Sequence, residues 1–437
     1  MLTPISSELV QQTMDTLHIP EIGKATIRQM VGLSQLIEQT TGKRFIHFEM
    51  GSPGLPACQV GIEAEKEALD SGVASIYPNI AGIPQIKNAA SRFIKAFLDI
   101  DVAPEGCIPT VGSMMGSYSM FLATVQSRLP ERDTVLFINP GFPVQPLQVK
   151  IMGFNQESFD VYDYRGDKLR EKLESYLKTG RIASIIYSNP NNPAWICLND
   201  DELRTIGELA TAYDVVVIED LAYMGMDSRR DLGKPFQAPY QVTVAKYTDN
   251  YVLLMSGSKI FSYAGQRIAI AAISNKLFAR EYEGFRQRYG MARFGQAYIQ
   301  VILYAFSSGV CHSAQHALAA MMDAAADGRL NFVEITSEYA RRTKRLKDIF
   351  LRNGFHIVYD KDNDEPLSDG FFFTIGYKGY TGNGLLRELL NYGICAIALG
   401  STGSEQEGLR ACSSAVKEDD YDLLEERLKI FHVNNPL

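Results

Sequence analysis

One lysine in this sequence lies among residues that could act on a small molecule. The apolar run YVLLM, residues 251–255, leads into SGSKIFSYAGQR, in which Ser256 and Ser258 precede Lys259 and Arg267 follows it by eight residues. A desolvated lysine near another cation has a lowered pKa and becomes a nucleophile. A lysine just past a strand is more often a solvated surface residue, so the other segments have to decide between these interpretations.

Polar or aromatic residues also follow the other apolar runs. They are Phe142 in NPGFP, Asn192 in NPNNPAW, and Asp220 and Tyr223 in EDLAY. The loop TVGSMMGS, residues 110–117, opens a helix with glycine and serine. Free backbone N–H groups at such a helix start suit a phosphate.

The elements that must position these residues alternate along the chain. Apolar runs of strand type are TVLFI (134–138), IASIIY (182–187), VVVIE (215–219), YVLLM (251–255) and RIAIAAI (267–273). Helical periodicity covers residues 86–98 and 169–177, and Asn199 with Glu202 predicts a capping box at the start of a helix that continues to Ala212. Strands separated by helices predict an α/β domain with a largely parallel sheet, whose ligands bind beyond the carboxyl ends of the strands.

We expect three segments along the chain. Residues 51–308 form the large domain, and residues 309–437 form a smaller α+β domain with FHIVYD, GFFFTIGY, GICAIAL and a charged C-terminal helix. Residues 1–50 form an N-terminal segment that packs with the small domain. That segment contains a helix from about Ala25 to Gln39, followed by FIHFEMG and the loop GSPGLP.

One cleft would then collect an anion cradle, an aromatic ring, an amide, a carboxylate, a phenol and a lysine. This set matches the needs of a phosphorylated aromatic aldehyde cofactor held as a Schiff base. Lys259 would supply the amine, and Asp220 would keep a proton on a pyridine nitrogen. The phosphate would be bound by Ser256, Ser258, Arg267 and the helix start after Gly112.

In this order along the chain, the motifs closely resemble the class I/II aminotransferases of the fold-type I, pyridoxal-phosphate-dependent superfamily. The resemblance runs from FEMGSP to RACSSA, most of the chain. It implies a large domain with a mostly parallel, seven-stranded sheet covered by helices, a smaller α+β domain, and pyridoxal 5′-phosphate as cofactor. It also implies amino acid and 2-oxo acid substrates.

The resemblance implies a role for each matching residue. Lys259 forms the Schiff base, Asp220 pairs with the pyridine nitrogen, and Tyr223 and Asn192 bond the ring 3-hydroxyl; Phe142 stacks on the ring; Ser113, Met114, Ser256 and Arg267 bind the phosphate. Lys259, Asp220 and Tyr223 are the expected catalytic residues. Arg410 in GLRACSS, with Gly51 and Asn192, binds the substrate's α-carboxylate. Tyr77 in YPNIAG reaches the phosphate of a neighbouring subunit, which implies a homodimer with shared sites.

Two positions depart from the family pattern. The usual NPTG reads NPAW here, from Asn192 to Trp195, and Phe142 stands where tryptophan or tyrosine is common. The asparagine that contacts the cofactor is kept, but a bulky residue lies beside it. The substrate is therefore not predicted from the motif; Arg229, Arg230 and the arginines of RQRYGMAR (286–293) are candidates for a second substrate carboxylate.

Composition excludes several classes of protein. The 437 residues carry a formal net charge of −8 without basic blocks, so nucleic acid and anionic membranes are not expected partners. The six cysteines are scattered without a CxxC pair, and no HExxH pattern occurs, so we expect reduced thiols and no metal. No signal peptide or membrane-spanning run is visible, which predicts a cytoplasmic protein.

Other functions use similar motifs. SGSK also fits the SxxK of β-lactamase-like enzymes, but KTG at residues 178–180 precedes it and SDN is missing. YRGDK, residues 164–168, fits the YxxxK of short-chain dehydrogenases, but no GxGxxG follows a strand. Three readings stay open on the resembling site: an aminotransferase, a lyase or cyclopropane-forming (ACC-synthase-like) synthase, and a sensor without turnover. The last is disfavoured by the intact lysine.

Overall fold

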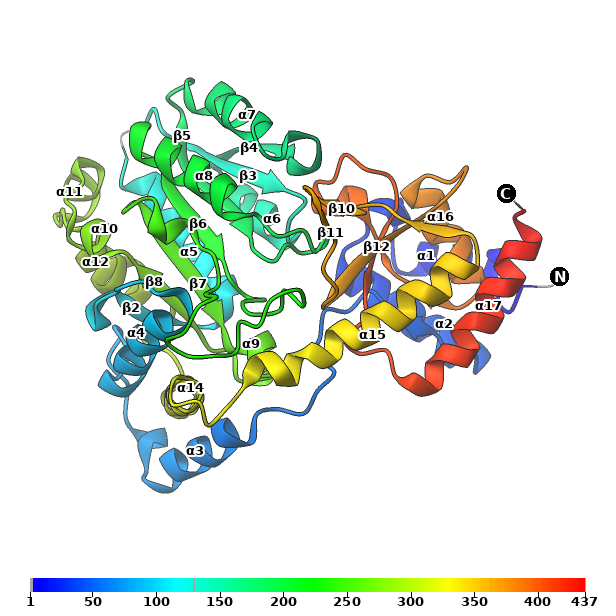
Figure 1. Cartoon of the computed structure of the whole chain (residues 1–437), viewed down its shortest axis with the longest axis horizontal. Coiled ribbons are helices and arrows are strands. Elements are labelled where there is room, and N and C mark those ends of the chain that lie inside the picture. Colours follow the sequence, from blue (N-terminus) through cyan, green and yellow to red (C-terminus); the bar gives the residue numbers. More distant parts are fainter. Residues whose placement is uncertain (1–2, 129, 437) are drawn as a thin grey trace.

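The computed structural model describes residues 3–128 and 130–436, which form two connected bodies (Figure 1). The larger body contains the main sheet, and the smaller one carries both chain ends on its far side (Figure 1). Helix α15, Phe332–Arg352, extends from the larger body into the smaller one (Figure 1). No helix in the described ranges is both long and apolar enough to cross a lipid bilayer.

The large sheet has seven strands in the order β2-β8-β7-β6-β5-β3-β4. Their bounds are β2 Cys107–Thr110, β3 Thr134–Asn139, β4 Asn155–Asp160, β5 Ile182–Ser188, β6 Val216–Asp220, β7 Tyr251–Ser256 and β8 Ala269–Ile273. Only β8 runs antiparallel to its neighbours. The central strands are buried along their length, as expected of a parallel sheet with helices on both faces. The expected fold is confirmed.

Helices cover both faces of this sheet. One apolar cluster joins it to α4 and α14, and another joins the opposite face to α5. The helices of this body are α3 Gln59–Asp70, α4 Pro84–Leu98, α5 Gly112–Gln126, α6 Val144–Ile151, α7 Lys168–Leu177, α8 Asp200–Ala212, α9 Gly257–Ile260, α10 Asn275–Ala279, α11 Glu283–Tyr289, α12 Phe294–Ala297, α13 Tyr304–Ser307 and α14 His312–Ala326. The expected capping box of Asn199 and Glu202 opens α8.

The smaller body contains an antiparallel sheet, β14-β15-β12-β9, and the parallel pair β1-β13. These strands are β1 Ile46–His47, β9 Phe355–Ile357, β12 Phe372–Tyr377, β13 Ile394–Cys395, β14 Ile397–Ala398 and β15 Leu409–Cys412. An apolar cluster joins them to α1 Ser7–Thr16, α2 Ile27–Thr41, α15, α16 Gly382–Asn391 and α17 Tyr421–Asn434. The domain boundaries at residues 50 and 308 stay predictions; α14, just past the second one, packs on α3 and α4.

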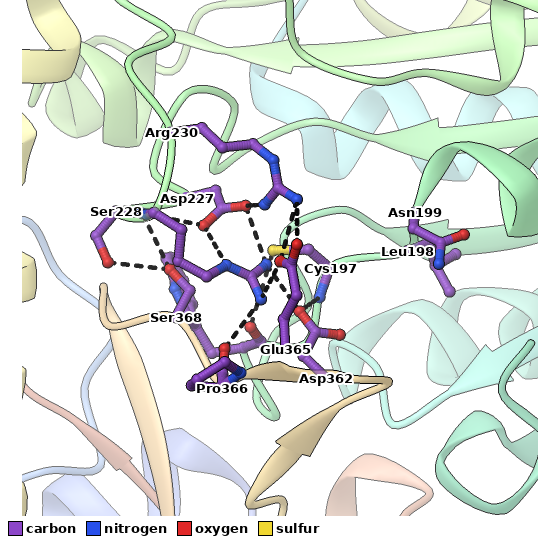
Figure 2. A network of polar contacts seen from close by, with 12 residues as sticks. Cys197, Leu198, Asn199, Asp227, Ser228, Arg230, Asp362, Glu365, Pro366 and Ser368 are labelled. Atoms are coloured by element: carbon purple, nitrogen blue, oxygen red, sulfur yellow. Dashed lines mark hydrogen bonds and ion pairs between the residues drawn. The ribbon is translucent and has the colours of Figure 1, made fainter. Parts of the chain in front are cut away.

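A segment that we call the strap, residues 359–368, runs from β9 to β12 and binds the large domain. It contains the hairpin of β10 Lys361–Asp362 and β11 Glu365–Pro366. Asp362 forms an ion pair with Arg165 at 2.9 Å. Glu365 forms one with Arg230 at 3.0 Å (Figure 2). Because Asp362 is only 2% exposed, this contact is shielded from solvent and holds the strap firmly.

Candidate active site

A cavity of about 700 Å³ is lined by residues of both domains, at the carboxyl ends of the central strands. Its lining includes eleven of the twelve residues to which the family resemblance gives a role: Gly51, Ser113, Met114, Phe142, Asn192, Asp220, Tyr223, Ser256, Lys259, Arg267 and Arg410. Strand pairing explains part of this convergence, because Ser188 at the end of β5 is level with Asp220 at the end of β6. Lys259 lies in the short helix α9, directly after β7.

Lys259 has a buried amine that is held in place. Its side-chain nitrogen donates a hydrogen bond to the backbone carbonyl of Gly51 and lies 5.0 Å from the ring centre of Phe371. Burial lowers the pKa of Lys259 to about 8, and the positive charges of Arg410 and Arg267 act in the same direction. Near neutral pH a useful fraction of this amine is therefore unprotonated and nucleophilic.

Asp220 provides the only carboxylate among the residues that line the cavity. It is 8% exposed and accepts hydrogen bonds from the Gln145 side chain at 3.2 Å and the Ala222 backbone N–H at 3.1 Å. Burial raises the pKa of Asp220 to about 6, against the effect of these hydrogen bonds. A carboxylate in this position is poised to bind a protonated nitrogen, which would compensate its buried charge.

The start of helix α5 forms a cradle together with Arg267. A side chain on Gly112, whose φ is +66°, would place its Cβ 2.4 Å from a guanidinium nitrogen of Arg267. The guanidinium is 3.4 Å from the Ser258 hydroxyl, and the Ser113 hydroxyl is buried without a partner among the described residues. Free amides at a helix start beside an arginine and two hydroxyls suit a phosphate.

Arg410 supplies a buried cation from the small domain. It lies in β15, is 1% exposed, and donates to the backbone carbonyl of Glu49. Its guanidinium carbon is 5.1 Å from the ring centre of Phe372, and its Nε has no partner among the described residues. Burial lowers the pKa of Arg410. A planar donor left partly unpaired in a cavity suits a carboxylate.

Tyr77 is the one residue with a role implied by the family resemblance that does not line the cavity. It is 91% exposed and follows the short helical turn Val73–Ser75. The predicted role of Tyr77 in a neighbouring subunit stays a prediction.

Sequence comparison decides the family. A model of the family described as "Aminotransferase class I and II" matches residues 43–428, most of the chain. The chain belongs to this family. Two curated relatives are similar to this chain. The probable aspartate aminotransferase of Methanocaldococcus jannaschii is 25% identical to it over 232 residues. The glutamate–pyruvate aminotransferase of Escherichia coli is 29% identical to it over 239 residues.

These matches cover 53% and 54% of this chain and only 58% and 55% of the relatives' own lengths. Among solved structures, a double mutant of the Thermus thermophilus aspartate aminotransferase superposes with a TM-score of 0.75 at 18% identity. That match covers 93% of this chain and 96% of the other. At this identity it confirms the fold.

Class I and II aminotransferases use pyridoxal 5′-phosphate, and the residues present fit that group. Three buried polar atoms of the cavity lack partners among the described residues: the Asn192 side-chain oxygen, the Ser113 hydroxyl and the Arg410 Nε. The cradle at Gly112 leaves room for a phosphate, and Lys259, Asp220 and Tyr223 offer an amine, a carboxylate and a phenol. Burial raises the pKa of Tyr223 well above its usual value, so the phenol keeps its proton and can donate it in a hydrogen bond.

Several residues that line the cavity belong to no motif in the sequence. One face of helix α2 borders the cavity with Ile27, Arg28, Val31, Gly32 and Gln35. Gln145 and Phe372 also line the cavity and contact Asp220 and Arg410, respectively. The proposed substrate arginines do not line this chain's cavity: Arg229 and Arg230 pair with Asp227 at 2.8 and 2.7 Å. The missed positions share no motif, and only the packing of α2 against the small domain brings that helix to the cavity.

Proposed function

We propose that this chain is an aminotransferase that moves an amino group from an amino acid to a 2-oxo acid with pyridoxal 5′-phosphate. The observation that carries the proposal is the buried amine of Lys259, which shares one cavity with Asp220 and Arg410. The names of the curated relatives support the same reaction class.

Each charged residue then has a task. When bound, pyridoxal 5′-phosphate supplies an aldehyde for the substrate's amino group and a ring that accepts electrons from the Cα–H bond. Lys259 would hold the cofactor through its amine, and that amine, when free, would carry the proton to and from the substrate's Cα. Asp220 keeps a proton on the ring nitrogen. The same proton transfers in reverse serve the 2-oxo acid.

Arg410 binds the substrate's α-carboxylate in this proposal. Its neighbours Glu49 and Gly51 contribute backbone carbonyls that fix Arg410 and Lys259 respectively. Because both contacts come from one short segment, the amine and the guanidinium are held in a constant relation. Such fixed spacing favours proton transfer at Cα, since the carboxylate orients the bond to be broken.

The substrate side chain meets helix α2. Arg28 lines the cavity and forms no ion pair among the described residues. Of the charged residues that line the cavity, Arg28 is the one that would bind neither the cofactor nor the substrate's α-carboxylate. An amino acid with an acidic side chain therefore suits the cavity best, as the name of the first relative also suggests.

A dimer would complete the site. Ile76 and Tyr77 are exposed, and so are Tyr304 and Phe306. The two segments that carry these pairs approach each other where Gly309 packs on Pro78. Large exposed apolar side chains on adjoining segments favour a protein interface. In a dimer formed through this face, Tyr77 would reach the partner subunit's cavity.

Chemical trapping tests the proposed function. Borohydride reduction of the cofactor-loaded protein, followed by peptide mapping, should place the label on Lys259, and Lys259→Ala should carry none. A label on any other lysine would contradict the proposal.

A further inference from the structure

Trp195 occupies a position that suits glycine better. It is the only tryptophan of the chain, its side chain is 0% exposed, and its φ is +62°. Backbone with a positive φ is costly for a bulky residue. The indole N–H also has no partner among the described residues, which adds a second cost. We therefore expect the Trp195 side chain to make a contact that offsets both the backbone cost and the unpaired N–H.

That contact is with Tyr223. The Trp195 and Tyr223 rings meet edge to face, with centres 5.5 Å apart and planes at 70°. Phe372 lies 6.2 Å from the same indole. Both partners line the cavity, whereas Trp195 does not. The indole therefore packs behind the cavity wall and supports the phenol from the side away from the cavity.

Gly370 makes room for the indole. A Cβ on Gly370 would lie 1.9 Å from a ring carbon of Trp195, whereas the backbone of Gly370 has no positive φ that would itself require glycine. The Gly370 carbonyl accepts a hydrogen bond from the Thr343 hydroxyl at 2.6 Å. The indole thus has a fixed backbone on one side and Tyr223 on the other.

The flanks of this contact are held as well. Two residues after Trp195, the Cys197 backbone N–H donates to Asp362 of the strap at 3.0 Å (Figure 2). Two residues before Gly370, the hydroxyls of Ser368 and Ser228 lie 3.1 Å apart (Figure 2). These contacts of the strap restrain the backbone on both sides of the Trp195–Gly370 contact.

We propose that Trp195 is a positioning residue that fixes the Tyr223 phenol in the cofactor cavity, and that Gly370 supports the indole by packing against it. This inference rests on the proposed function, because it concerns the phenol's contact with the cofactor. The packing of the Trp195 indole on Tyr223 then offsets the cost of the positive φ of Trp195.

Four variants test it: Trp195→Ala, Trp195→Phe, Tyr223→Phe and the double variant Trp195→Ala/Tyr223→Phe. The readouts are the cofactor's Kd from equilibrium dialysis and the absorbance spectrum of the bound cofactor across pH. Trp195→Ala should raise the Kd by about tenfold and shift the spectral midpoint in the same direction as Tyr223→Phe. The double variant should have nearly the same Kd and spectral midpoint as Tyr223→Phe alone. Trp195→Phe should keep most of the wild-type affinity for the cofactor.

Gly370→Ala provides a second test that keeps the tryptophan. Its methyl group should displace the indole, change the emission of this single tryptophan in the cofactor-free protein, and raise the cofactor's Kd. Combining it with Trp195→Gly should reduce that defect, because the methyl group then fills vacated space.

Three results would overturn the proposal. Wild-type Kd and spectra in both Trp195→Ala and Gly370→Ala would do so. An equally large effect of Trp195→Ala with and without the Tyr223 hydroxyl would show a general packing role instead. A wild-type protein that binds no cofactor would overturn the proposed function together with this inference, and is distinguished from the other two by the wild-type dialysis alone.

Discussion

The side-chain amine of Lys259 donates a hydrogen bond to the backbone carbonyl of Gly51, a residue 208 positions earlier in the chain. Gly51 follows β1, which pairs with β13 of the small domain, whereas Lys259 follows β7 of the large one. The contact therefore joins the amine to the segment that follows β1 of the smaller body. A backbone carbonyl holds the amine without placing a negative charge beside it, so burial can still lower its pKa.

The lowered pKa predicts how cofactor capture depends on pH. Only the neutral amine attacks an aldehyde, so the rate of attachment to cofactor-free protein should rise with pH and level off above about 8. Stopped-flow absorbance measures this rate. Lys259→Ala should lose this phase and keep only slow labelling of surface lysines. A rate that still rises steeply above pH 10 would mean that the amine has an ordinary pKa.

Asp220 should destabilise the cofactor-free protein. Its folded pKa of about 6 exceeds the unfolded value of 3.8, so its contribution to the free energy of unfolding is lost as pH rises from about 4 through 6. Asp220→Asn should therefore stabilise the cofactor-free protein at pH 8, by up to about 3 kcal/mol, and change little at pH 4. Denaturant unfolding at both pH values checks this.

Asp227 is the matched control for that experiment. Arg229 pairs with it and, together with further hydrogen bonds, outweighs its burial and lowers the pKa of Asp227. Asp227→Asn should therefore be less stable than the wild type at pH 8, which is the opposite of the effect expected for Asp220→Asn.

In the loaded enzyme Asp220→Asn should bind the cofactor more weakly and turn over orders of magnitude more slowly. Less than a tenfold loss of kcat, about 1.4 kcal/mol, would refute the assigned role.

Arg28 should determine the preference for acidic substrates. Arg28→Ala should raise KM for an acidic amino acid by about tenfold or more, because a charge-assisted hydrogen bond is lost, and should leave KM for alanine nearly unchanged. Arg28→Lys should keep part of the preference. Equal changes of KM for both substrates would show that Arg28 does not contact the side chain.

Subunit mixing tests the shared site. Combine Tyr77→Ala subunits with Lys259→Ala subunits: each hybrid dimer then contains one site with both residues intact and one with neither. Activity above the sum of the two parents is expected if Tyr77 acts across the interface. No recovery, with subunit exchange demonstrated by mass spectrometry, would place Tyr77 in its own subunit's site or outside any site.

The sequence was informative where chemistry follows strands. Asp220 ends a buried strand, and Asn192 and Lys259 each follow one within a few residues. Parallel strands bring their carboxyl ends together, so local patterns are enough to predict that these residues meet. The fold followed from the same alternation of strands and helices.

Contacts between distant segments were not predictable. Arg28 lies on α2, a helix whose buried residues pack into the core of the smaller body. The apolar spacing along α2 predicts that buried face, but it does not predict that the face with Arg28 borders a cavity. The packing of Trp195 against Gly370 is not predictable from local patterns either, because the two residues lie far apart in the chain. Such pairs depend on tertiary packing that no local period encodes.

The half-reaction tests the central claim most directly. Mixing the loaded enzyme with an acidic amino acid, in the absence of any 2-oxo acid, should convert the cofactor's absorbance to that of its amine form, with one equivalent of 2-oxo acid released per site. Adding a different 2-oxo acid should restore the original spectrum. Release of ammonia with the spectrum unchanged, as an eliminating lyase would give, would contradict the account.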